Sequence, residues 1–481
     1  MKRVRLTRAH LICSLLALVL VASLLFSACG TTTTSTTQTS TTTTMTSTTT
    51  TMTSTTTTTA QKVLKIGAVI DMRNARGLQG KKWLDLFAKL YNDAGGWKIG
   101  NDTYKVQMIL YDSQGNAQTA KDLLTRLVLQ DEVKFVLGQI STGSAQVDVT
   151  VTEPNKVIVI HEDLTDLAAS PENQYFYTTG NFFTNALIYK ITADMASTGA
   201  KSYVSVKPDN QVGRNMDSVI NAAWALGAPN AEYLGTVWVP PSTIDYGPIA
   251  TKIQSLNPDV ADLVYVGYIP NSIPQIYRAL YDVGFKGTIL PGLMSQADLD
   301  SLVVQVGKAA VEGGEMSPSG LDPRQYQTDP RLSSILNAYT AEYGKFETDG
   351  LTDTLQFFAL ETAINATQSI DVEVIKNYLD NSPPPIQTFY GWSTLVARAD
   401  IGNYRTNVFV PSNPVGLIRD GKLIAGPRVT CKDQYLFPII TRNLGDAYKA
   451  YWNQYGYPVF PPSDKPYETL TYAQLGITGQ D

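Results

Sequence analysis

Histidine and cysteine are scarce in this chain of 481 residues, which contains two His and three Cys. Zinc sites and Ser-His-Asp or Cys-His nucleophile systems need these residue types, so the sequence has little from which to build them. Beyond the first 28 residues, His161 is the only His. We interpret it as a polar residue at a strand end. We therefore predict that the chain is not an enzyme, has no catalytic residue and uses no metal or cofactor.

Strong net charge is also lacking. The formal net charge is −5 at pH 7, and beyond the N-terminus the basic residues do not form a cluster. Proteins that bind nucleic acid normally carry a basic patch or stripe. The composition therefore argues against nucleic acid as a partner.

The N-terminus combines four basic residues with an apolar run from Leu11 to Phe26. This pattern is typical of an export signal, and the run is short for a membrane span. A Ser-Ala-Cys junction ending at Cys29 resembles the bacterial lipobox, in which the signal (1–28) is cut before a Cys that receives lipid, although Phe26 departs from the usual Leu. We predict lipidation at Cys29 and an extracytoplasmic, membrane-anchored protein. Ordinary cleavage or an uncleaved anchor are the alternatives.

The segment 29–61 is dominated by threonine, with 22 Thr among the 29 residues that start at Thr31. It has too few apolar residues to offset the entropy of ordering it, so we predict a disordered tether. Because Cys13 lies in the signal and Cys29 carries the lipid, Cys431 has no disulfide partner. A bridge from Cys431 to Cys29 is the alternative.

From Val63 onward, short β-rich runs alternate with helical patterns. VLKIGAVID (63–71) is typical of a buried strand, and the residues from Leu84 to Tyr91 have helical spacing. Further strand-like runs are YKVQMILY (104–111), VKFVLG (133–138), VIVIH (157–161), SYVSV (202–206) and DLVYVG (262–267). Strands separated by helices imply parallel sheets covered on both faces, so we predict an α/β fold.

Two such series, at 62–180 and 183–316, precede a helix-rich stretch at 330–382, which indicates two lobes. We assign 62–180 plus about 317–390 to lobe 1, 181–316 plus about 391–430 to lobe 2, and 431–481 to a C-terminal extension that packs on a lobe. Ligands of such sheets bind beyond the carboxyl ends of the strands, where the strand order switches. We therefore expect the ligand in the cleft between the lobes.

The loop from Gly138 to Ala145 leaves a strand and opens a helix. Its free N–H groups and the helix dipole suit an anion such as a carboxylate. The hydroxyl groups of Ser141 and Thr142 add two further hydrogen bonds. Simple N-capping by a Ser/Thr-rich turn is the alternative.

Several short motifs follow one another in a particular order along the chain. They are IGAVID (66–71), NDAGGWKIG (92–100), Tyr111-Asp112 before a helix, LVLQDEVKFVLGQISTGSA (127–145), VIVIHEDLTD (157–166), PDNQVGRN (208–215) and DLVYVGYIPN (262–271). Each motif is weak alone, but together with the lipoprotein signal they resemble the type I solute-binding proteins of ABC transporters, in the leucine-binding group. The resemblance covers about 63–427 and implies two lobes, each a mostly parallel sheet flanked by helices.

The resemblance also implies ligand contacts. In that family the ligand is held by a hydroxyl-bearing loop with a backbone group, by a backbone carbonyl followed by a Thr, and by an aromatic residue of the second lobe. In this chain the matching positions are Ser141 and Thr142 with Ile140, then Leu164 and Thr165, then Tyr268.

The chain departs from the family pattern at other positions. Val212 stands where relatives often have a Tyr. Leu293 and Met294 stand where amino-acid binders place a carboxylate against the ligand ammonium. Since an ammonium buried without a counter-charge is costly, this departure weakens an amino-acid assignment. Arg73 and Arg76 either lie on the surface or face the cleft, where they favour an anionic ligand.

The sequence thus predicts a monomeric, membrane-tethered solute-binding lipoprotein that closes around a small ligand and delivers it to an ABC transporter permease. A carboxylate without a free α-amino group, organic or aromatic, is slightly favoured over a branched-chain or other amino acid. The alternative from another class is a ligand-sensing domain for a membrane receptor.

Overall fold

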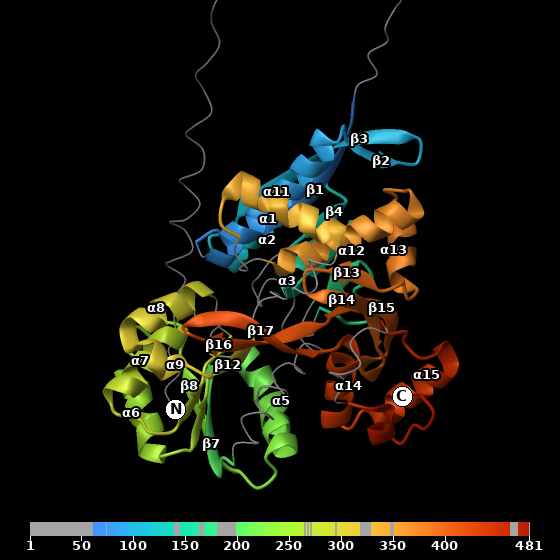
Figure 1. Cartoon of the computed structure of the whole chain (residues 1–481). Helices are drawn as coiled ribbons and strands as arrows, with labels where there is room; N and C mark the ends of the chain where they lie inside the picture. The colour runs from blue at the N-terminus through green and yellow to red at the C-terminus, as the bar shows by residue number, and fades with distance from the viewer. Residues whose placement is uncertain are drawn as a thin grey trace, which may run out of the picture. The chain divides into compact units, whose positions relative to one another are not determined.

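Parallel strands form the middle of a nine-stranded sheet in the computed structural model of this chain (Figure 1). β1 (Lys62–Ile70) pairs with β3 (Asp102–Asp112) on one side and with β4 (Phe135–Leu137) on the other. β5 (Ile158–His161) and β6 (Phe176–Thr178) continue the parallel order. The carboxyl ends of these strands therefore lie side by side. In the description of the candidate site, the word edge refers to this row of carboxyl ends.

The structure describes residues 61–73, 75–138, 145–162, 168–179, 199–263, 266, 269, 272–293, 296–317, 329–346, 351–461 and 470–480. Residues 60–481 form one compact unit. Within the described ranges, no helix has both the length and the apolar character needed to cross a membrane.

Helices cover both faces of the nine-stranded sheet because alternate strand residues point to opposite sides. Leu64 and Ile66 of β1 pack on one face, whereas Val69 packs on the other. The first face carries α1 (Ala75–Asp93), α11 (Pro330–Tyr343), α12 (Thr352–Thr367) and α13 (Val372–Asp380). The second face carries α2 (Ala117–Leu129) and α3 (Ala145–Thr152). The two layers of helices bury the strands between them, as expected for a parallel sheet.

Antiparallel strands complete the two edges of the sheet. β2 (Trp97–Ile99) pairs with β3, while β13 (Ile386–Thr388), β14 (Gly391–Arg398) and β15 (Asn403–Pro411) form the other edge. β15 lies parallel to β6. The sequence assigned about 391–430 to the second lobe, so this pairing corrects the boundary: β14 and β15 belong to the sheet of β1.

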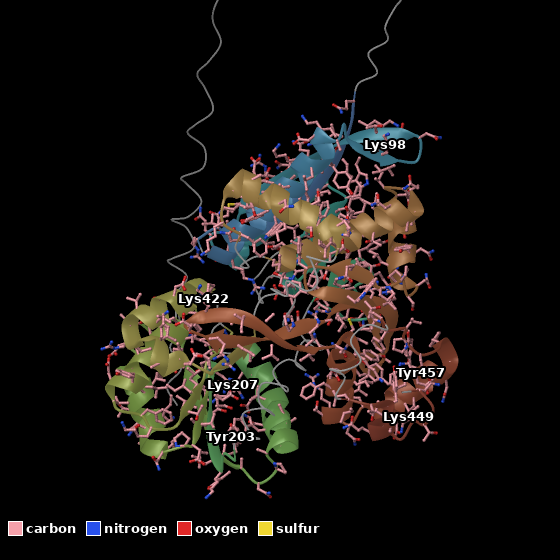
Figure 2. All side chains as sticks on the ribbon, in the orientation of Figure 1. Lys98, Tyr203, Lys207, Lys422, Lys449 and Tyr457 are labelled. Carbon is pink, nitrogen blue, oxygen red and sulfur yellow. The ribbon has the colours of Figure 1, made fainter. Side chains whose placement is uncertain are left out.

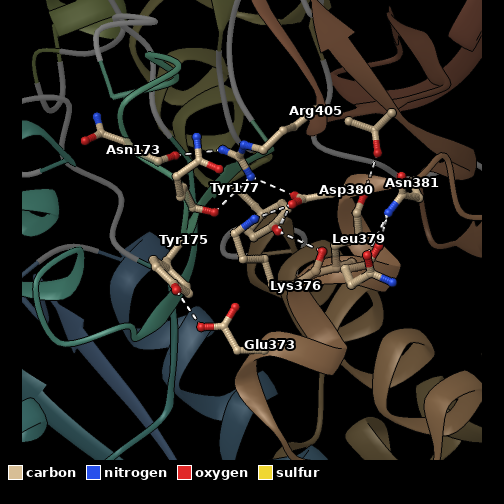
Figure 3. Close-up of polar contacts among 12 residues, drawn as sticks. Asn173, Tyr175, Tyr177, Glu373, Lys376, Leu379, Asp380, Asn381 and Arg405 are labelled. Atoms are coloured by element: carbon tan, nitrogen blue, oxygen red, sulfur yellow. Dashed lines mark hydrogen bonds and ion pairs between the residues drawn. The ribbon is translucent and has the colours of Figure 1, made fainter. Parts of the chain in front are cut away.

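Arg405 of β15 ties this edge to its neighbours (Figure 3). Its guanidinium donates to Asp380 Oδ1 of α13 at 2.7 Å and to the carbonyl oxygens of Gln174 and Asn173 at 2.9 and 2.7 Å. It also lies 5.4 Å from the ring centroid of Tyr177 in β6. These contacts connect β15 to α13, to β6 and to the residues that precede β6.

The second series of strands forms its own parallel sheet, in the order β10-β9-β7-β8. The strands are β7 (Ser202–Pro208), β8 (Glu232–Val239), β9 (Val260–Asp262) and β10 (Thr288–Leu290), with α5 (Gln211–Gly227), α6 (Gly247–Leu256) and α7 (Ser272–Asp282) between them. The predicted strand at 262–267 is misplaced: β9 ends at Asp262.

A third, smaller sheet follows in the order β11-β12-β16-β17. It contains β11 (Gly292–Leu293), β12 (Glu315–Ser317), β16 (Asn413–Arg419) and β17 (Lys422–Val429), and α8 (Gln296–Val306) and α9 (Lys308–Val311) lie between its first two strands in the chain. β12 pairs antiparallel with β16. The chain therefore returns to its second series after it has completed the first sheet.

The C-terminal segment packs on β14 and β15. It contains α14 (Cys431–Thr441), α15 (Gly445–Tyr455) and the short 3-10 helix η5 (Tyr472–Leu475). The buried thiol of Cys431 donates to the carbonyl oxygen of Trp392 at 2.9 Å, and the Tyr448 hydroxyl donates to Asp400 Oδ1 at 2.8 Å. α14 also contacts α5.

Candidate functional site

Most residues that the sequence assigned to ligand binding lie outside the described residues. These are Ile140, Ser141, Thr142, Leu164, Thr165, Tyr268 and Met294, together with the lipidation residue Cys29. The backbone of Leu293 lies in β11. The described part of the chain nevertheless shows what surrounds the carboxyl ends of β4, β5 and β6, from which two of the predicted binding loops leave.

Arg73 lies on the surface beside the end of β1. Its Nε and Nη2 donate to Asp71 Oδ1 and Oδ2 at 2.8 and 2.9 Å, and its side chain is 61% exposed. The hydrogen bond to Asp71 raises the pKa of the Arg73 guanidinium. In this structure Arg73 is a surface ion pair, the first of the two placements that the sequence left open.

Arg76 lies closer to the strand ends than Arg73 does. Its Nη2 donates to Glu162 Oε2, just after β5, and to Thr352 Oγ1 at the start of α12 at 3.1 Å. The Glu162 side chain is 11% exposed and that of Arg76 32%. A partly buried pair of this kind places a cation at the sheet edge but neutralises the neighbouring carboxylate.

Asp353, the second residue of α12, is buried directly beside this pair. It is 1% exposed, and its Oδ2 has no hydrogen-bond partner among the described residues. A Cβ atom added to Gly80 or Gly138 would collide with the Asp353 carboxyl group, so these two glycines make room for it. Burial raises the pKa of Asp353 to about 7, which the nearby Arg76 opposes and Glu162 reinforces.

Two further polar side chains at this edge have unused hydrogen-bonding capacity. Gln356, one turn after Asp353, is fully buried, and neither its Oε1 nor its Nε2 has a partner within the described ranges. The same holds for the hydroxyl of Thr179, which follows β6. Since buried polar groups are normally satisfied, this concentration at the strand ends marks a place where polar groups are available to a ligand.

His161, at the end of β5, is buried and neutral. Burial lowers its pKa to about 3, so its Nε2, 3.6 Å from Asp148 Oδ2, contacts the carboxylate as an uncharged imidazole rather than as an ion pair. A group with such a low pKa is a poor general base at neutral pH. This environment agrees with the interpretation of His161 from the sequence as a polar residue at a strand end.

The polar groups at this edge are suited to binding a small molecule. Among the described residues, no group of three His, Cys, Asp or Glu side chains is placed to hold a metal ion. The edge instead offers a guanidinium, a carboxyl group poised between two protonation states, an amide and a hydroxyl. Such groups orient a small polar molecule in a site of limited water access.

Sequence reasoning missed Asp353 and Gln356. They lie in α12, where every residue from Asp353 to Glu361 is buried. The available signal was the occurrence of two polar residues three positions apart beside the apolar run from Phe357 to Leu360, a spacing that places both on one helix face.

The second series contributes a buried lysine at a strand end. Lys207 of β7, labelled in Figure 2, donates to Asp217 Oδ1 of α5 at 2.6 Å. Asp217 also accepts from Thr236 of β8. Burial lowers the pKa of Lys207, an effect that the hydrogen bond to Asp217 opposes. Lys207 is already paired with Asp217, so we assign it a structural role at this strand end rather than a role in ligand binding.

The sequence from residue 63 to residue 399 matches the family model described as "Periplasmic binding protein". The chain belongs to the periplasmic binding protein family. The family expected from the motifs is thereby confirmed. Residues 400–481, including all of β15, α14 and α15, lie beyond the matched range.

Among curated proteins, the chain is 26% identical over 222 residues to the Leu/Ile/Val-binding protein homolog 3 of Brucella melitensis. This match covers 45% of the chain and 57% of the relative, so the chain spans less than two thirds of that relative's length.

Two solved structures are similar to the fold. A leucine-binding protein from Thermotoga maritima is 17% identical with a TM-score of 0.61, covering 76% of this chain and 99% of that one. A solute-binding protein of an ABC transporter from Rhodopseudomonas palustris, solved with benzoate, is 15% identical with a TM-score of 0.60, covering 76% and 97%. These similarities confirm the predicted two-lobe, type I periplasmic-binding-protein fold.

Proposed function

We propose that this protein is an extracytoplasmic solute-binding protein that delivers a small carboxylate-bearing ligand to an ABC transporter. The observation that carries the proposal is the match of residues 63–399 to the periplasmic binding protein family. The polar edge formed by Arg76, Asp353 and Gln356 supports it, because ligands of parallel sheets bind beyond the carboxyl ends of the strands. The family is one of solute-binding proteins, not of enzymes.

For the ligand, we infer a carboxylate without a free α-amino group, organic or aromatic. The contacts that we assign to it are Ile140, Ser141, Thr142, Leu164, Thr165, Tyr268, Leu293 and Met294. Arg73, which the sequence also suggested, is left out because it lies on the surface in an ion pair with Asp71. Hydroxyl groups and backbone N–H groups suit its carboxylate, whereas Leu293 and Met294 offer no counter-charge to an ammonium.

Acidic residues elsewhere in the chain are candidates to take over the ammonium of an amino acid. Two of them are already paired: Glu162 accepts from Arg76, and Asp209 accepts from Arg214. Asp353 shares the edge, but with a pKa of about 7 it is only partly charged at neutral pH. The pairing of Glu162 and Asp209 favours the acid over the amino acid. Structural neighbours from Rhodopseudomonas palustris were solved with benzoate and with 3,4-dihydroxybenzoic acid, which is the same ligand class.

An amino-acid ligand is the second candidate. The observation in its favour is the similarity to a protein named as a Leu/Ile/Val-binding homolog. The two candidates differ in one chemical group, the α-ammonium, and therefore in the need for a free carboxylate at the site.

A lipid on Cys29 and the Thr-rich segment 29–61 would keep the binding domain close to the membrane in which the permease lies. A single acyl chain anchors a protein only marginally, whereas the multiple chains of a lipoprotein anchor hold it stably. We propose this arrangement for the exported protein, with one copy acting as a monomer.

A thermal-shift screen tests the proposed function. A ligand that binds only the folded state increases the free energy of unfolding by RT ln(1 + [L]/Kd), which is about 2.7 kcal/mol at a ligand concentration of 100 Kd. The melting temperature rises accordingly. The panel should contain aromatic and aliphatic acids, their α-amino counterparts and neutral esters. We expect at least one acid to give a concentration-dependent rise. No shift with any acid or amino acid, combined with hydrolysis of an ester, would contradict the proposal.

A further inference from the structure

A cavity lies between the nine-stranded sheet and the C-terminal segment. Its volume is about 340 Å³, within the range of roughly 300 to 1,000 Å³ that is usual for small-molecule pockets. One wall comes from β14 and from the prolines that precede β13, including Pro384. The other comes from α14, α15 and the residues after α15, including Tyr451, Tyr455 and Tyr457. This second wall lies wholly beyond residue 399, where the match to the family ends.

The lining of this cavity carries no formal charge. The described residues around it contain no acidic, basic or amide side chain; the polar side-chain groups are hydroxyls of Tyr, Thr and Ser, such as that of Thr394. A carboxylate or an ammonium buried here would lack a counter-charge, which is costly. The cavity therefore differs in chemistry from the polar edge at Arg76 and Asp353, and its occupant should be uncharged.

Two rings of the lining belong to a stack that extends beyond the cavity. Tyr451 and Tyr455 line the cavity and stack on Tyr404 of β15, which is outside the lining, with ring centroids 5.6 and 5.5 Å apart and interplanar angles of 8° and 27°. Tyr404 and Tyr455 are about half exposed, at 53% and 54%. Offset stacking of this kind adds to the energy of burying the ring surface, and the exposed faces are open to a further ring.

The segment that forms the second wall is fixed by contacts of its own. Trp452 Nε1 donates to the Tyr435 hydroxyl at 2.9 Å, and Tyr457, labelled in Figure 2, stacks on Trp452 with centroids 5.1 Å apart. Tyr435 and Tyr457 both line the cavity. The wall is therefore preorganised, which reduces the entropy lost when a ligand binds.

We propose that this cavity is a second ligand site, specific for an uncharged aromatic molecule such as a phenol. Stacked tyrosines and proline rings supply flat apolar surface, and hydroxyl groups supply neutral hydrogen-bond partners. A sugar is disfavoured, because the lining has no carboxylate or amide to fix several ligand hydroxyls at once. This site does not depend on the proposed transport function.

Fluorine NMR of 4-fluorophenol with the full mature protein tests the proposal. Val459 lines the cavity and is 75% exposed, so Val459→Glu places a charge at the mouth with little effect on folding. The matched control is Val304→Glu, a substitution in α8 at a valine that is 86% exposed and does not line the cavity. We expect Val459→Glu to weaken 4-fluorophenol binding at least tenfold and Val304→Glu to leave it unchanged.

Two further probes complete the test. Tyr455→Ala, which removes a half-exposed ring of the stack, should weaken 4-fluorophenol binding several-fold. Val459→Glu should leave the affinity for 4-fluorobenzoate unchanged, because a charged acid does not use this cavity. The proposal is overturned if 4-fluorophenol does not bind at millimolar concentration, if both Glu variants weaken it equally, or if a fluorinated hexose binds at Val459 while 4-fluorophenol does not.

Discussion

Replacing Asp353 by Asn should change how stability depends on pH. In the folded protein the pKa of Asp353 is about 7, against 3.8 without the protein environment. Between these values the folded state keeps a proton that the unfolded state has lost. The stability contributed by this group therefore falls as the pH rises from about 4 to about 7 and is constant above that.

The magnitude follows from the pKa difference. About three pKa units at 1.36 kcal/mol each correspond to about 4 kcal/mol, which the ionised, buried carboxylate costs at pH 8 relative to pH 4. Asn has nearly the same shape but does not ionise. The free energy of unfolding of Asp353→Asn, relative to the parent, should thus increase by about 4 kcal/mol from pH 4 to pH 8.

Urea unfolding followed by tryptophan fluorescence, at several values from pH 4 to pH 8, measures this difference. His161 contributes with the opposite sign, since its low folded pKa removes stability as the pH falls below about 6.5, but this contribution is common to both proteins and cancels. Asp446→Asn, at a fully exposed carboxylate in α15, is the control and should give no pH-dependent difference. A pH-independent difference for Asp353→Asn would refute the reasoning.

Three further predictions concern other parts of the chain. Arg405→Leu should lower the free energy of unfolding by about 1 to 3 kcal/mol in urea titrations, because Asp380 loses one of its two cationic partners and keeps Lys376; a loss under 1 kcal/mol would be inconsistent with the network in Figure 3. Thr142→Ala should weaken acid binding about tenfold in calorimetry, since one charge-assisted hydrogen bond contributes roughly 1.5 kcal/mol or more, with Thr125→Ala as the neutral control. Cys29→Ser should release the protein from membranes or block its processing; unchanged fractionation and gel migration would rule out lipidation.

Local patterns were sufficient to predict much of the fold. The apolar run of β1 and the helical spacing after it identify their elements, and the series of such units indicates parallel sheets. The segment that forms β14 and β15 was assigned to the second lobe, whereas it joins the sheet of β1. Which sheet a strand joins depends on contacts between segments more than 200 residues apart, such as Val408 with Thr178, and no local pattern encodes these.

The candidate site shows the same division. Glycine and hydroxyl-rich loops after strands are visible in the sequence as anion-binding candidates, so Ser141 and Thr142 could be named. Asp353 could not, because its importance comes from the packing of α12 against Gly80 and Gly138. Whether Arg73 or Arg76 approaches the strand ends likewise depends on side-chain placement, which puts Arg73 on Asp71 and Arg76 on Glu162.

Calorimetric titration with phenylpyruvate and phenylalanine distinguishes the proposed acid ligand from an amino acid, because the two compounds share a ring and a carboxylate and differ at the α-carbon. We expect the 2-oxo acid to bind more tightly, since Glu162 and Asp209 are paired and Leu293 and Met294 carry no charge. Tighter binding of phenylalanine would contradict this expectation and would show that a free carboxylate, such as Asp163, meets the ammonium.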